Sequence, residues 1–268
     1  MPAQPQRKAE EIGGRMTAMD SALRSGLQLN QVAWKSVHND LLKLYKVPSE
    51  SAVASALLAC LESYRFDRSQ QALEWAVRAR AMPHIQGDHL GWLYSAAVRL
   101  GEFSFADEIE AQANAIGFEL ELKKRIALSM QMGLIRKAAS LMFPNGTQGA
   151  DTWRGSFIDL KRASDYMGFH GIEDTAVSTR MQLAHRLYSE LTKQPVFNCV
   201  VEATDVGVLL GFPHFGSVEE GEAIEWRIAE AMAEKFEDTL GEHVSFVAYP
   251  SEALAWDDDS KELNVCRS

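Results

Sequence analysis

Apolar residues recur at three- and four-residue spacing through most of the chain, from Met16 to about Lys193. In one segment they stand at Leu57, Leu61 and Tyr64. This spacing places apolar side chains along one face of an α-helix, so this part of the chain is predicted to be helical almost throughout. Turn-forming residues interrupt the pattern and predict short connections between helices of about 12 to 18 residues. The interruptions lie at residues 46–51, 81–89 and 143–151.

The pattern changes after Pro195 to an alternation of period two. Residues 196–213 are rich in β-branched side chains and predict two short strands that turn near the sequence ATDVG. Residues 217–242 predict a helix, with a serine cap and early glutamates, and residues 243–250 predict a third strand. We expect a small β-β-α-β unit whose helix covers one face of the sheet, followed by a polar tail.

A short phrase of glycine and alanine recurs within the helical part. In the segment GEFSFADEIEAQANAIGFE, residues 101–119, Gly101 is followed by Ala106 and then by Ala113. Related phrases stand before and after it at a spacing of about 34 residues, a period typical of helical repeat proteins. Their matching residues are Ala72 and Ala79, then Gly133 and Ala138, and more weakly Gly171 and Ala176.

These residue types suit a helical hairpin for physical reasons. Glycine can adopt a positive φ at the tight turn between two antiparallel helices. Alanine lets the second helix cross the first closely, whereas a larger side chain would push the pair apart. We therefore expect a turn at Gly101, and close helix contacts at Ala106 and Ala113.

The repeated phrase resembles the tetratricopeptide repeat family over about residues 50–145, and more loosely as far as residue 193. In one unit the matching residues are Leu93, Gly101, Phe103, Ala106 and Ala113. The resemblance implies an α-solenoid of stacked helical hairpins, whose concave face binds a segment of a partner protein. Such a scaffold needs no catalytic residue, cofactor or metal, and none is assigned.

Two alternatives stay open. Gly117, eleven residues after Ala106, equally resembles the pentatricopeptide repeat, which implies RNA binding. The chain also departs from the tetratricopeptide pattern, because Glu110 replaces a bulky aromatic residue and a closing proline appears only at Pro83. An irregular helical bundle is the alternative fold.

Charge divides the chain unevenly. Residues 1–193 hold 23 Lys and Arg against 21 Asp and Glu, whereas residues 194–268 hold 4 against 16. Such asymmetry predicts two parts with different roles. We expect a helical repeat domain over residues 1–193, and a small acidic α+β domain with a polar tail over residues 194–268. The acidic domain is expected to meet a basic surface, on a partner or on the repeats.

Motifs for catalysis and metal binding are weak. The chain has no nucleophile elbow, P-loop or dinucleotide fingerprint, and the GVLLGFPHFG segment is predicted to be an aromatic turn rather than a phosphate cradle. His84, Asp88 and His89 could hold a metal, but they lack a stereotyped spacing. His170 with Glu173 and Asp174 could form a catalytic group, although carboxylates at a helix start are also favoured by the helix dipole.

The remaining composition points to a soluble protein. Cys60, Cys199 and Cys266 are far apart and predict neither a disulfide framework nor a thiolate zinc site. No apolar run approaches the roughly 20 residues that cross a bilayer, and the first residues resemble no signal peptide. The expected location is cytoplasmic.

The strongest positive cluster is the candidate partner-binding site. Its residues are Lys123, Lys124, Arg125, Arg136 and Lys137. They could line one face of a solenoid and bind an acidic peptide, this chain's own acidic domain or a phosphate backbone. The sequence thus favours a protein-binding adaptor or a subunit of a larger complex, with RNA binding as the alternative.

Overall fold

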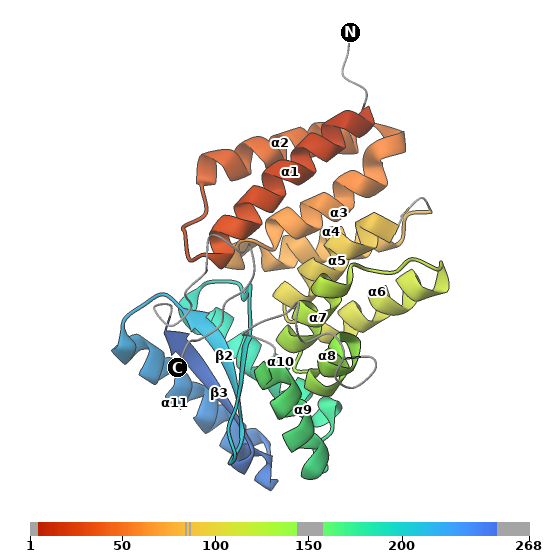
Figure 1. Cartoon of the computed structure of the whole chain (residues 1–268). Coiled ribbons are helices and arrows are strands. Elements are labelled where there is room, and N and C mark those ends of the chain that lie inside the picture. Colours follow the sequence, from red (N-terminus) through yellow and green to blue (C-terminus); the bar gives the residue numbers. More distant parts are fainter. Residues whose placement is uncertain (1–4, 84, 86, 144–157, 251–268) are drawn as a thin grey trace. The chain divides into compact units, whose positions relative to one another are not determined.

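The computed structural model describes residues 5–83, 85, 87–143 and 158–250 of the 268-residue chain. It is mainly helical, with a small three-stranded sheet near the C-terminus, as predicted (Figure 1). The chain divides into two units, which are described one at a time. The first comprises residues 1–120 with 193–197, and the second residues 121–192 with 198–268. Within the described part, no helix is long and apolar enough to cross a membrane.

The first unit is built from consecutive helices joined by short connections. They are α1 (Pro5–Arg24), α2 (Gln31–Tyr45), α3 (Ser51–Glu62), α4 (Ser69–Arg80), α5 (Gly87–Arg99) and α6 (Phe103–Ala115), with the short 3-10 turns η1 (Pro48–Glu50) and η2 (Phe66–Arg68). Helix α3 packs against α4, the next helix, and also against α5, and α5 packs against α6. Neighbouring helices therefore pair as the sequence predicted.

The turn glycines adopt the predicted conformation. Gly101 between α5 and α6 has φ 75°, and Gly133 and Gly171 have φ 73° and 67°. At Gly101 the chain closes the end of α5, because the amide of Glu102 donates to the carbonyl oxygen of Ala97 at 2.9 Å. A side chain at such a positive φ is strained, which explains why glycine recurs at these turns.

Most alanines of the phrase are fully buried. Those of the first three copies, Ala72, Ala79, Ala106, Ala113 and Ala138, are all at most 1% exposed. In the fourth copy Ala176 is only half-buried, and the fully buried position is Val177. Burial of the repeated alanines agrees with the packing interpretation in three copies and not in the fourth.

A short return segment, Lys193–Phe197, belongs to the first unit although it follows α10 of the second in sequence. Its last residue is held firmly: the carbonyl oxygen of Phe197 accepts a hydrogen bond from Arg24 Nη1 at 2.8 Å. The Arg99 guanidinium lies 4.7 Å from the centroid of the Phe197 ring. The predicted domain boundary at residue 193 therefore lies at the start of this return segment, which packs in the first unit.

The second unit combines four helices with the predicted β-β-α-β segment. Its elements are α7 (Leu122–Gln131), α8 (Ile135–Met142), α9 (Ile158–Phe169), α10 (Asp174–Thr192), β1 (Val200–Ala203), β2 (Val208–His214), α11 (Val218–Lys235), η4 (Thr239–Glu242) and β3 (Val244–Pro250). The serine cap predicted for α11 is present, and it forms a capping box between Ser217 and Glu220. The order of the last four regular elements, β1, β2, α11 and β3, confirms the prediction.

The sheet has the order β1-β2-β3. Strand β2 pairs antiparallel with β1 and parallel with β3, so α11 is the crossover between two parallel strands. Helix α11 packs on β3, and α9 contacts β1. Tyr188 of α10 lies 5.1 Å from the Phe212 ring of β2. The predicted repeat domain over residues 1–193 includes α7 to α10, and in the structure these helices group with the sheet, where α9 contacts β1.

Candidate functional site

The five basic residues predicted as a binding site fall into two groups. Lys123, Lys124 and Arg125 lie in the first turn of α7, and Arg136 and Lys137 in the first turn of α8. The turn between the two helices lies next to the second group. The first group is separated from that turn by residues 126–131, the last six residues of α7, a length of about 9 Å. The structure therefore does not gather all five residues at one point.

Carboxylates already lie against the second group. Asp174 accepts hydrogen bonds from the backbone amides of Arg136 and Lys137 at 2.9 and 2.8 Å. Glu173 Oε1 lies 3.3 Å from Arg136 Nη1. Asp174 thus caps the N-terminus of α8, a different helix from the one it begins, and this structural role accounts for its position.

His170 lies in an aromatic cluster and not beside a catalytic carboxylate. Its ring centroid is 4.6 Å from that of His243 and 4.3 Å from that of Tyr166. The Tyr166 hydroxyl donates to the carbonyl oxygen of Val206 at 2.9 Å, so it accepts from His243 Nδ1 at 2.8 Å. These contacts join α9 to the β1–β2 turn and to His243, the residue between η4 and β3.

The other candidates give no site among the described residues. No group of three or more His, Cys, Asp or Glu side chains that could hold a metal occurs there. His84, which the possible metal group needs, and Cys266 lie outside the described residues. Cys60 and Cys199 are buried free thiols, and burial raises the pKa of Cys199 to about 12.

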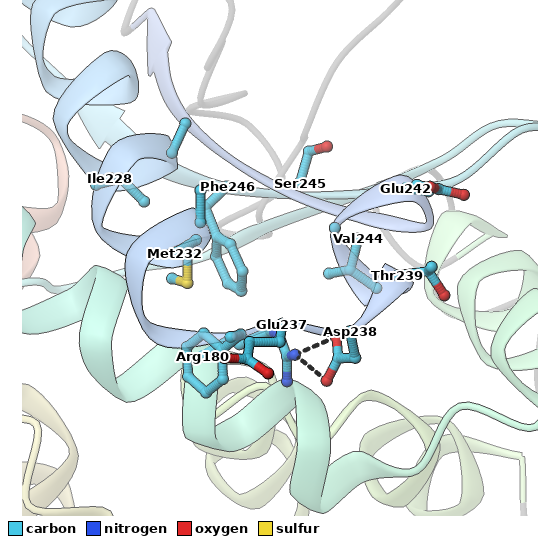
Figure 2. A pocket seen from close by; sticks show the side chains of 14 residues that line it. Arg180, Ile228, Met232, Glu237, Asp238, Thr239, Glu242, Val244, Ser245 and Phe246 are labelled. Carbon is cyan, nitrogen blue, oxygen red and sulfur yellow. Dashed lines mark hydrogen bonds and ion pairs between the residues drawn. The ribbon is translucent and has the colours of Figure 1, made fainter.

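A pocket in the second unit is the strongest candidate that the structure adds. It has a volume of about 630 Å³ and lies among α11, η4 and β3, with one side chain from α10 (Figure 2). Ile228 and Met232 point into it from α11, and Val244 and Phe246 line it from β3. A pocket of this size with apolar walls favours a ligand with an apolar group, because binding removes that group from water.

Local sequence explains how the pocket forms. Helix α11 ends at Lys235, and Phe236 is already extended, with φ −125° and ψ 120°. Asp238 then caps η4 by accepting a hydrogen bond from the Leu240 amide at 3.0 Å. The chain therefore turns back sharply before β3, and the turn walls one side of the pocket.

Arg180, the positively charged side chain in the pocket lining, forms an ion pair with Asp238. Arg180 Nη2 donates to both carboxylate oxygens of Asp238, and its side chain is only 6% exposed. The guanidinium also lies 4.1 Å from the centroid of the Phe236 ring. The hydrogen bond from the Leu240 amide, followed by that from Arg180, lowers the pKa of Asp238. Arg180 is therefore neutralised by the protein itself.

The pocket consequently has an acidic rim. Three carboxylates line it, those of Glu237, Asp238 and Glu242, against the single guanidinium of Arg180. Glu237 and Glu242 are exposed, and neither forms an ion pair within the described part of the chain. Apolar walls beside surplus negative charge favour a ligand that carries both an apolar group and a positive charge.

Comparisons with protein-family models, with curated proteins and with solved structures find no match to this chain. Interpretation of the pocket therefore rests on its geometry. Ile228 and Met232 have the four-residue spacing of an apolar helix face, a spacing that does not separate a core residue from a pocket residue. The closely spaced carboxylates at Glu237, Asp238 and Glu242, directly after that helix, are the sequence signal for the rim.

Proposed function

We propose that this protein is a non-enzymatic adaptor or assembly subunit that binds another protein through the acidic pocket of its second unit. The observation that carries the proposal is the combination of apolar walls at Met232 and Phe246 with exposed carboxylates at Glu237 and Glu242. The one guanidinium of the lining, Arg180, is engaged by Asp238. A basic segment with an apolar side chain can contact the apolar walls and the exposed carboxylates at the same time.

The first unit serves in this proposal as a scaffold of tetratricopeptide-like hairpins. Support comes from the positive φ of Gly101, the full burial of Ala106 and the packing of α3 against both α4 and α5. These are the contacts that stacked hairpins make. The scaffold carries the acidic unit and offers further surface to an assembly.

RNA binding receives weaker support. Nucleic-acid sites need several cations free to meet phosphates. At the start of α8, Asp174 and Glu173 lie against Arg136 and Lys137, which reduces the positive field there. Absorbance at 260 nm of the purified protein measures co-purifying nucleic acid directly.

Affinity capture with charge-reversed baits tests the adaptor function. The bait is the full chain, and the pocket variant carries Glu237→Lys and Glu242→Lys. Asp205→Lys, an exposed position in the β1–β2 turn outside the pocket lining, is the matched control. We expect specific proteins in the native extract to bind wild type and the control but not the pocket variant. Capture of the same proteins by all three baits contradicts the proposed site.

A further inference from the structure

The β3 strand lies at one edge of the sheet, since the strand order is β1-β2-β3. Val208 donates its amide to the carbonyl oxygen of His243 at 2.8 Å, which fixes the register of the pair. In parallel pairing, alternate residues turn their backbone groups to the neighbouring strand. The backbone groups of Ser245 and Val247 therefore face β2, whereas those of Val244, Phe246 and Ala248 face away from it.

The far end of this outer edge is already occupied. The Ala248 amide donates to Glu225 Oε1 of α11 at 2.9 Å, so the helix covers that end. Among the described residues, no hydrogen bond satisfies the outward amides and carbonyls of Val244 and Phe246. Unpaired strand-edge groups are a template for pairing with another chain.

The unpaired edge borders the pocket. Val244, Ser245 and Phe246 all line it. Successive side chains on a strand point to opposite faces. Contact with three successive residues is what a pocket that extends to the edge of the strand would make. The apolar walls and the acidic rim line the same pocket as these residues of β3 (Figure 2).

Resting on the function proposed above, we propose that the partner segment binds as an added strand along β3, at Val244 and Phe246. Its backbone pairs with the outward groups of these two residues, in the mode known as β-strand addition. One of its apolar side chains enters the space beside Met232. Its lysine or arginine side chains meet Glu237 and Glu242 at the rim.

Charge identifies the occupant as a basic segment of another protein. The chain's own residues 251–268 hold five Asp and Glu against two Lys and Arg, so the rim carboxylates repel them. A second copy of β3 would bring the same carboxylates, since the segment from Glu237 to Glu242 accompanies it. A partner rich in lysine or arginine is the occupant whose charge complements this edge.

The experiment uses the full chain and a synthetic peptide of about six residues, the usual length of a strand, with alternating valine and lysine. Amide hydrogen exchange is followed by NMR. At about ten times the Kd of the peptide, we expect the Val244 and Phe246 amides to exchange about tenfold more slowly. The Ser245 and Val247 amides should not change, because they already face β2.

Two control peptides separate strand addition from general attraction. In one, glutamate replaces lysine, and this peptide should not bind. In the other, alternate backbone amides are N-methylated, which keeps the side chains but removes donors on one edge, and binding should be lost. Equal binding of the N-methylated peptide, without slowed exchange at Phe246, overturns strand addition but leaves the proposed pocket function intact.

Three further results also overturn strand addition. One is selective capture of proteins by the wild-type bait while the valine–lysine peptide fails to bind. Another is slow exchange of the Phe246 amide in the peptide-free monomer, at the rate of the Val247 amide. That result would identify the chain's own tail as the occupant. The third is protection that rises with protein concentration alone, which identifies a second copy. Loss of both peptide binding and selective capture removes the proposed function as well.

Discussion

The buried charges of the first unit and the rim carboxylates of the second unit serve different purposes. In the first unit, Arg99 is only 4% exposed and donates to Asp20 at 2.7 Å and Ser63 at 2.8 Å. Its guanidinium lies 4.8 and 4.7 Å from the ring centroids of Tyr64 and Phe197, which contact each other at 5.9 Å. Every one of these contacts lies within the first unit, so the charge of Arg99 serves the fold.

Glu62 of the first unit is a second example. Its side chain is fully buried, and it accepts hydrogen bonds from Arg68 Nε and Nη2 at 2.8 and 3.0 Å. His38 Nε2 lies 2.9 Å from the same carboxylate. The carboxylates of Glu237 and Glu242 in the second unit, in contrast, stand exposed beside an apolar pocket.

This difference separates charges that specify a fold from charges that remain available to a partner. A buried ion pair with good geometry fixes the arrangement of its helices, and removing one member leaves the other desolvated. An exposed carboxylate adds little to stability, but it can gain a new partner on binding. Substitutions in the two units should therefore separate stability from binding.

Arg99→Met should have the largest effect on stability. It leaves Asp20 and Ser63 without their buried cation, and breaking such a pair costs about 3 kcal/mol. Chemical denaturation measures the free energy of unfolding, and hydrogen exchange should place the loss in the first unit. Arg78→Met, an exposed guanidinium over Trp75, is the control and should change the stability little. Equal losses of stability in the two variants would contradict the role of the buried Arg99 charge in stabilising the fold.

The pH dependence of the second unit should follow His185. Burial lowers the pKa of His185 from 6.5 to about 4. Below pH 6.5 the unfolded chain takes up a proton that the folded chain does not take until about pH 4. Stability is therefore full above pH 6.5 and falls as the pH decreases to about 4, by about 3 kcal/mol in total.

Denaturation of His185→Gln at several pH values tests this effect. The variant should lose most of the decline, whereas His170→Gln, at an exposed histidine of the same unit, should keep it. An unchanged decline in the His185 variant would assign the pH dependence to other groups. Because His185 belongs to the second unit, hydrogen exchange should show the loss there rather than in the first.

Ala106→Leu should destabilise the first unit by about 2 kcal/mol. Ala106 is 0% exposed, and overpacking a closely packed helix contact forces the backbone apart. Ala111→Leu is the matched control, since it makes the same change on the exposed side of α6. Thermal unfolding should separate the two variants by several degrees. Similar melting temperatures would contradict the interpretation of the repeated alanines as contact points.

Glu242→Lys should have the smallest effect on stability, below about 0.5 kcal/mol, because the side chain is exposed and unpaired among the described residues. It should nevertheless weaken binding of the valine–lysine peptide by more than tenfold, which titration calorimetry measures. Asp205→Lys should leave the affinity nearly unchanged. Large destabilisation by Glu242→Lys would place this carboxylate among the charges that serve the fold.

The sequence was sufficient to predict the local structure of much of this molecule. The helical period, the turn at Gly101, the close contact at Ala106 and the β-β-α-β order all depend on short-range chemistry. Positive φ at glycine and a period of two in strands are properties of neighbouring residues. Such properties are visible without knowledge of the tertiary structure.

Two features could not be predicted from the sequence: the boundary between the two units, and the pocket. An apolar helix face has the same spacing whether it covers another hairpin or a sheet, so the contact of Tyr188 with Phe212 was not predictable. Met232 likewise has the spacing of a core residue, although it lines a pocket. The five basic residues were grouped by proximity in sequence, whereas α7 separates Lys123 from Arg136 in space.

The return segment has a consequence for synthesis of the protein. Ribosomes deliver the N-terminal part first, and such parts usually fold as they emerge. Here the ring that covers Arg99 belongs to Phe197, which is made only after α7 to α10. The first unit therefore waits for most of the chain before its Arg99 site can close. Nascent chains stalled before residue 193 should expose this site to solvent, and chains extended beyond residue 197 should protect it.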